Sequence, residues 1–165
     1  MLEHRSCSGT FVVNVTQSSY QAEENQNITL EWTFTIKKEM TLTSLYILCE
    51  LFTDLKHFTL FQLHEGVEVP ESQDEHFAGR VQFDKDVLRE GRIRLHVSRL
   101  RTDDSGLYLC EVKTNYGVSY GECRLNVTVS PSYLQSPPCR PTMLSSLNLV
   151  TIVSVFISSS RGYSR

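Results

Sequence analysis

The chain has 165 residues, of which 40% are hydrophobic and 21% are charged. This composition can bury a core, and the length accommodates one domain of roughly 100–150 residues plus short extensions. The formal net charge of −3 gives no electrostatic reason to expect a nucleic-acid partner.

The first nine residues do not predict a regular element. Cys7, Ser8 and Gly9 are small residues of the kind that precede a signal-peptide cleavage site. The apolar segment that should come before them is missing, because Glu3, His4 and Arg5 occupy that space. Two interpretations stay open, a signal-peptide remnant and a disordered tail, and in both cases Cys7 is a poor candidate for a structural disulfide.

Residues 10–129 contain short apolar alternations separated by polar turns. Eight or nine short strands at this spacing, without helical periodicity, predict an all-β sandwich. The expected strands lie around residues 11–15, 28–32, 45–51, 58–63, 80–83, 93–97, 108–112 and 120–129, with a solvated acidic loop over 65–75. Alternation turns inward Leu45, Ile47, Cys49 and Leu51 of one strand and Leu125, Val127 and Val129 of the last.

The segment Asp104-x-Gly106-x-Tyr108-x-Cys110 is typical of the corner between strands E and F of an immunoglobulin sandwich. A tyrosine two residues before a cysteine is placed to bond its hydroxyl back onto the preceding turn. Tyr108 and Cys110 then share the inward face, while Leu109, Glu111 and Lys113 share the outward one.

The C-terminal segment changes composition. Residues 130–142 hold four prolines and predict an extended stalk. Residues 143–160 are apolar but interrupted by polar side chains, so they predict at most a marginal transmembrane segment, with residues 161–165 as a short tail. The alternative is a frayed tail that does not span a membrane.

The cysteines depart from the usual immunoglobulin order of Cys, Trp, Cys on strands B, C and F. Here Trp32 occupies the strand-B position and Cys49 the strand-C position, so the usual bridge between the sheets cannot form. We expect a Cys49–Cys110 disulfide within one sheet, with Trp32 packed on it from the other. Two alternatives remain: Cys110–Cys123, if the last hairpin is centred between Tyr116 and Gly117, and free thiols throughout.

At this point residues 10–130 resemble the V-type domain of the programmed-death ligand and butyrophilin-like costimulatory family. The more particular matches are Phe77-Ala-Gly-Arg80 and Lys85-Asp86, followed by the Arg92–Val97 strand and the Asp104–Cys110 corner. The resemblance implies an immunoglobulin V-set sandwich in which Arg80, at the start of strand D, pairs with Asp104 of the corner.

No catalytic or cofactor chemistry is indicated. The five histidines lack metal-ligand spacing, and there is no phosphate loop, nucleophile elbow or H-E-x-x-H motif. The acidic loop lacks the ligand spacing of a calcium loop. We therefore expect a protein that is not an enzyme and that binds no cofactor and no metal.

The expected location is the plasma membrane, on its extracellular side, or the extracellular medium. Five cysteines fit an oxidising compartment, and the sequons at Asn14, Asn27 and Asn126 predict N-linked glycans. The resemblance implies a ligand that binds a protein receptor on immune cells and modulates their activation. Alternatives are a homophilic adhesion module, with weak self-association, and a soluble decoy form of such a ligand.

The expected partner surface is the outer face of the sheet that contains strands C and F. Strand parity turns outward Leu48, Glu50, Leu109, Glu111 and Lys113, a mixture of apolar and charged side chains. The resemblance adds Phe61, Leu63, Tyr116 and Tyr120 from strand C′ and the FG hairpin. The alternative is a solvated face with a tyrosine-rich turn.

Overall fold

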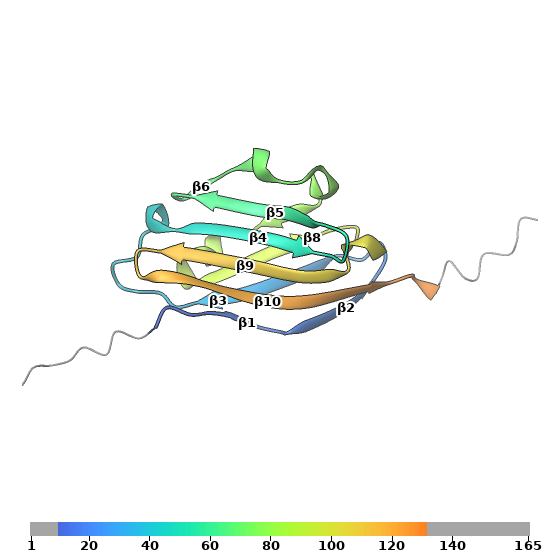
Figure 1. The fold of residues 1–165 in the computed structure, drawn as a ribbon, viewed down its shortest axis with the longest axis horizontal. Coiled ribbons are helices and arrows are strands. Elements are labelled where there is room, and N and C mark those ends of the chain that lie inside the picture. The colour runs from blue at the N-terminus through green and yellow to red at the C-terminus, as the bar shows by residue number, and fades with distance from the viewer. Residues whose placement is uncertain (1–9, 132–165) are drawn as a thin grey trace, which may run out of the picture. The chain divides into compact units, whose positions relative to one another are not determined.

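Two β-sheets face each other in the computed structural model, which describes residues 10–131 (Figure 1). The smaller sheet has the order β1 (Val13–Val15), β3 (Ile28–Phe34), β8 (Arg92–Val97), β7 (Val81–Phe83). The larger has the order β2 (Ser19–Glu23), β10 (Gly117–Thr128), β9 (Gly106–Thr114), β4 (Tyr46–Phe52), β5 (His57–His64), β6 (Val67–Glu68). Short 3₁₀ helices lie at Leu42–Ser44, Pro70–Ser72, Glu75–Phe77, Asp86–Glu90 and Thr102–Asp104. The all-β prediction is confirmed.

The N-terminal strand divides between the two sheets. β1 pairs antiparallel with β3 in the smaller sheet, whereas β2 pairs in parallel with β10 in the larger one. The apolar alternation stops at Val15, and the polar residues that follow carry the chain across. Tyr20 and Ala22 then pack against the core from β2. Sequence analysis did not predict β2, which forms the edge of the larger sheet.

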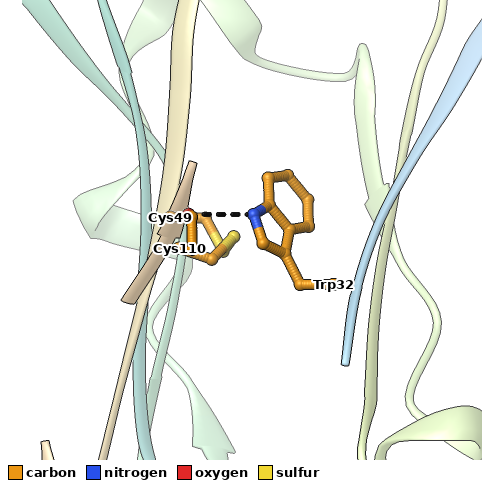
Figure 2. The surroundings of a disulfide bond; sticks show 4 residues. Trp32, Cys49 and Cys110 are labelled. Carbon is orange, nitrogen blue, oxygen red and sulfur yellow. Dashed lines mark hydrogen bonds between the residues drawn. A yellow bond between two sulfur atoms is a disulfide. The ribbon is translucent and has the colours of Figure 1, made fainter. Parts of the chain in front are cut away.

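The centre of the core is a disulfide in one sheet and a tryptophan in the other (Figure 2). Cys49 of β4 lies directly opposite Cys110 of β9, and the two are bonded, with Cα atoms 4.1 Å apart. Trp32, fully buried on β3, points across at them and donates a hydrogen bond from Nε1 to the carbonyl oxygen of Gly121, 3.0 Å away. Although Trp and Cys are exchanged along the sequence, the core still packs a tryptophan on a disulfide. The disulfide lies within the larger sheet instead of bridging the two sheets, and the tryptophan packs on it from the smaller sheet.

Gly121 makes room for this tryptophan. It sits on β10 directly opposite Cys110. A Cβ atom at this position would lie 2.9 Å from Cδ1 of Trp32 and 3.2 Å from Val13 Cγ1. Only a residue without a side chain lets the indole approach the backbone of the larger sheet closely enough for its hydrogen bond.

The corner before β9 has the expected tyrosine hydrogen bond. The Tyr108 hydroxyl donates to the carbonyl oxygen of Asp104 at 2.8 Å. The Asp104 carboxylate is fully buried and accepts from Nη1 and Nη2 of Arg80 at 2.9 and 2.6 Å. It also accepts from the backbone N–H of Arg101 at 2.8 Å and contacts His76 Nε2 at 2.8 Å. The ion pair implied by the family resemblance is thus present, and both oxygens of its buried carboxylate are engaged.

The last hairpin differs from the register proposed for the Cys110–Cys123 alternative. Its turn consists of Asn115 and Tyr116, and Thr114 pairs with Gly117, so Cys123 lies opposite Tyr108 rather than Cys110. Cys123 is a free, buried thiol, and burial raises its pKa to about 12. Leu125 and Val127 face inward as predicted, but Val129 was predicted wrongly: it lies beyond the end of β10 and is 50% exposed.

The proposed signal-peptide remnant, Cys7, most of the stalk, the marginal transmembrane segment and the short tail lie outside the described residues. Within residues 10–131 no helix is long and apolar enough to cross a membrane.

Candidate protein-binding face

The outer surface of the six-stranded sheet brings most of the predicted contact residues together. Leu48 of β4 lies opposite Glu111 of β9, and Glu50 lies opposite Leu109. Tyr120 of β10 lies on the other side of Glu111. Inward neighbours on these strands are buried, as parity requires, while Tyr120 is 59% exposed.

Further outward residues join this surface at the end of the sheet that carries the turn between β9 and β10, Asn115 and Tyr116, which we call the FG turn. Tyr46 lies opposite Lys113, and Lys113 lies opposite Val118 of β10. Val118 is 54% exposed. We call the front patch the set Tyr46, Leu48, Glu111, Lys113, Val118 and Tyr120. Tyr46 and Val118 were not predicted from the sequence. Tyr46 has the parity of Leu48 on β4, and Val118 has the parity of Tyr120 on β10, two residues before the start of the expected strand.

Tyr116 lies in the hairpin turn rather than on the sheet. The Thr114 hydroxyl accepts a hydrogen bond from the Tyr116 backbone N–H at 3.0 Å and donates to the Gly117 carbonyl at 3.2 Å, which fixes the tight turn. The Tyr116 ring is 37% exposed, and Lys37 Nζ lies 5.7 Å from its centroid. Tyr116 therefore lies in the turn at the end of the sheet, two residues before Val118 of the front patch.

Phe61 and Leu63 were assigned to the outer face wrongly. Both are buried, with exposed fractions of 8% and 1%. The pairing of β4 with β5 is irregular between Cys49 and Glu50. Cys49 pairs with Phe61 and Glu50 pairs with Thr59, so Leu60 is an extra residue without a partner on β4. Such a bulge reverses strand parity, so Phe58 and Leu60 face the core before it and Phe61 and Leu63 face the core after it.

A hollow of about 600 Å³ borders the front patch near the FG turn. Its walls include Tyr46, His64, Glu111 and Lys113. The Tyr46 and His64 rings meet edge to face with centroids 5.9 Å apart, so they form a firm aromatic wall. This concavity beside exposed tyrosines offers a place for a projecting side chain of a partner protein.

The two outer faces of the sandwich differ in how their charges are used. On the smaller sheet Glu31 binds Arg92 and Arg94, each at 2.9 Å, and Arg94 also binds Asp84. Burial opposes ionisation of Glu31, but the hydrogen bonds from the two arginines outweigh it and lower the pKa of this carboxyl.

Three charged groups on the outer face of the larger sheet are not paired in this way. Glu50, Glu111 and Lys113 form no ion pair with any residue of the part of the chain that the structure describes. Unpaired charges on a surface are available to complementary charges on a partner. The larger sheet is therefore the better candidate for binding.

Within residues 10–131 no group of three or more His, Cys, Asp or Glu side chains is arranged to hold a metal ion. The closest approach to a catalytic pair is His76 with Asp104, and the Asp104 carboxylate is already engaged by Arg80.

Known proteins resemble this chain over the described domain. No protein-family model matches the sequence. The protein named programmed cell death 1 ligand 1 of the mouse, Mus musculus, is 26% identical over 117 residues, which are 71% of this chain and 39% of that protein. The chain thus spans about two fifths of the length of this relative.

Two solved structures share the fold. The human B7-H4 IgV-like domain gives a TM-score of 0.61 at 21% identity, covering 72% of this chain and 97% of that one. Bovine butyrophilin gives a TM-score of 0.59 at 17% identity, covering 72% of this chain and 55% of that one. Both likenesses extend over the two-sheet sandwich.

Proposed function

We propose, from the premise that this chain carries an immunoglobulin V-set domain of the programmed-death ligand and butyrophilin-like kind, that it is an immune ligand at the cell surface or secreted from the cell. In this role it binds a protein receptor on lymphocytes and modulates their activation. The similarity to a mouse protein named as a ligand supports this class of function. The disulfide and the sequons at Asn14, Asn27 and Asn126 support an extracellular setting.

The front patch is the observation that carries the proposal. It combines exposed Tyr120 and Val118 with unpaired Glu111 and Lys113 on one continuous sheet face. Binding sites between proteins are enriched in tyrosine, which buries a large area at a small cost in side-chain entropy. Rim charges then steer association and select the partner.

Homophilic adhesion is the second candidate. Strand β9 presents Glu111 and Lys113 two residues apart, so two copies related by a two-fold axis could pair opposite charges across the same patch. In that case the partner would be a second copy of this chain.

A binding screen separates these functions. The secreted protein, displayed in multivalent form, is tested against cells that each express one lymphocyte surface receptor, and its self-association is measured by analytical ultracentrifugation. The ligand proposal predicts a specific receptor and a monomer at micromolar concentration. Concentration-dependent dimers without any receptor would favour adhesion. If neither a receptor nor a dimer is found, the front patch no longer supports either function.

A further inference from the structure

An open hollow of about 1080 Å³ lies on the larger sheet at the end far from the FG turn. Its floor includes Phe52 of β4 and Leu107 of β9, which pair directly across the sheet. Leu55, in the turn that follows β4, also lines it and is 95% exposed, while Phe52 is 37% exposed. Exposed apolar side chains gathered in one concavity indicate that something covers them.

The hollow is not built for a diffusing small molecule. Such sites direct a few buried polar groups at their ligand. Among residues 10–131, the buried side-chain nitrogen or oxygen atom left without a partner is Nε of Arg80, which does not line the hollow. His76, which does line it, is engaged through Nε2 with Oδ1 of Asp104 at 2.8 Å. The polar groups at its edge are exposed instead, as in Asp54 and Arg124.

Asn126 stands at the rim of this hollow. It is exposed on the outward side of β10 and is one of the lining residues. Asn126-Val-Thr128 is an N-glycosylation sequon. Nδ2 of Asn126 donates to Oε1 of Gln21 at 2.9 Å, which holds the amide along the sheet surface. Glycosylation replaces one of the two Nδ2 hydrogens, so the other can keep this hydrogen bond.

We propose that the first sugars of an N-linked glycan on Asn126 fill the hollow. The C–H face of an N-acetylglucosamine ring is apolar and packs on Phe52 and Leu107, while its hydroxyl and acetamido groups meet Arg124 and Asp54 at the edge. At about 1080 Å³ the hollow is slightly larger than the roughly 300–1,000 Å³ of sites for drug-sized ligands, so it has room for the first sugars of the glycan. Covalent attachment at the rim makes the packing intramolecular, so it costs less entropy than binding a free sugar would.

This placement leaves the front patch open. Tyr120 and Asn126 both face outward from β10 and are six residues apart, a separation of roughly 20 Å at about 3.4 Å per residue. The glycan covers one end of the larger sheet, and the other end stays accessible to a protein partner.

The test compares full-length protein from secretory cells as wild type, Thr128→Ala and Thr128→Ser. Alanine abolishes the Asn126 sequon, whereas serine keeps it. Asn14→Gln removes a glycan from the opposite sheet and is the matched control. Peptide mass mapping gives the occupancy of Asn126, and two readouts follow: amide hydrogen exchange of residues 53–56, and binding of an apolar fluorescent dye.

In the Thr128→Ala variant the amides of residues 53–56 should exchange roughly three- to tenfold faster, which is the loss of protection expected when one packed ring contact is removed. This variant should also bind more dye. Thr128→Ser with an occupied site and Asn14→Gln should match wild type. Trimming wild type with an endoglycosidase that leaves one N-acetylglucosamine should retain most of the protection. The proposal is overturned if Asn126 is unoccupied in secreted protein, or if Thr128→Ala behaves like Asn14→Gln.

Discussion

Replacing both members of the Cys49–Cys110 disulfide by alanine tests the rearranged core. The bond joins adjacent strands of one sheet and closes a loop with a sequence separation of 61 residues. In the chain-entropy treatment a closed loop of this length restricts the unfolded chain enough to stabilise the fold by about 4 kcal/mol. Removing two buried sulfur atoms beside Trp32 adds roughly 1 kcal/mol of lost packing each.

The total of about 6 kcal/mol is a large part of the roughly 5–15 kcal/mol that stabilises a typical domain. Urea unfolding followed by Trp32 fluorescence measures it, because this is the single tryptophan of the chain. With a slope of about 2 kcal/mol per molar urea, near the middle of the usual range, the midpoint should fall by roughly 3 M. Adding a thiol reductant to wild type should produce most of the same change.

Cys123→Ala is the matched control, since it removes a buried thiol that forms no disulfide. It should cost only about 1 kcal/mol. If the double variant unfolds within about 1 kcal/mol of this control, the in-sheet disulfide does not stabilise the domain. Recovery of a peptide linking Cys110 to Cys123 under non-reducing conditions would also contradict the structure.

Three further substitutions test the core and the smaller sheet. Asp104→Asn should destabilise the fold by about 3–5 kcal/mol in urea unfolding, because it leaves a buried arginine unpaired, whereas Lys85→Ala, which breaks an exposed ion pair, should cost less than about 1 kcal/mol. Glu31→Gln should reduce stability at neutral pH and match wild type well below pH ~4. The folded-state pKa of this carboxyl is lowered, so its contribution to stability is lost as the pH falls through that value. Urea unfolding at a series of pH values is the measurement, and a difference in unfolding free energy that does not change with pH would refute the prediction. Gly121→Ala should lower the melting temperature by an amount equivalent to about 1–3 kcal/mol, since the added methyl group meets Trp32, and an unchanged melting temperature would show that the indole has room to move.

The sequence pattern correctly predicted which side chains face the core in strands that alternate regularly. Alternation correctly turned Ile47 and Cys49 of β4 inward and left Leu48 and Glu50 outside. The hairpin register behind the Cys110–Cys123 alternative differs from the observed one by two residues, because hydrogen bonds of the Thr114 side chain fix a turn that the strand pattern does not specify. An even shift preserves parity, which is why Cys123 was correctly placed inward but opposite the wrong neighbour.

Irregularities of the backbone could not be predicted in this way. The bulge opposite Cys49 and Glu50 reverses parity within β5. Its sign in the sequence is two consecutive large apolar residues, Leu60 and Phe61, both of which are buried. The crossing of the N-terminal strand to form β2 depends on a free edge of β10, which is a property of the assembled sheet. The glycan hollow likewise joins residues from strands that are distant in sequence.

Binding of front-patch variants to receptor-bearing lymphocytes tests the central claim most directly. Tyr120→Ala and Glu111→Arg alter the front patch, while Gln82→Arg changes an exposed residue of the smaller sheet and serves as the control. The account predicts that each patch variant loses about tenfold or more in affinity, the cost of truncating a hot spot or reversing a contact charge, and that the control binds as wild type does. Undiminished binding by both patch variants, with the fold confirmed by circular dichroism, would place the binding site on another surface.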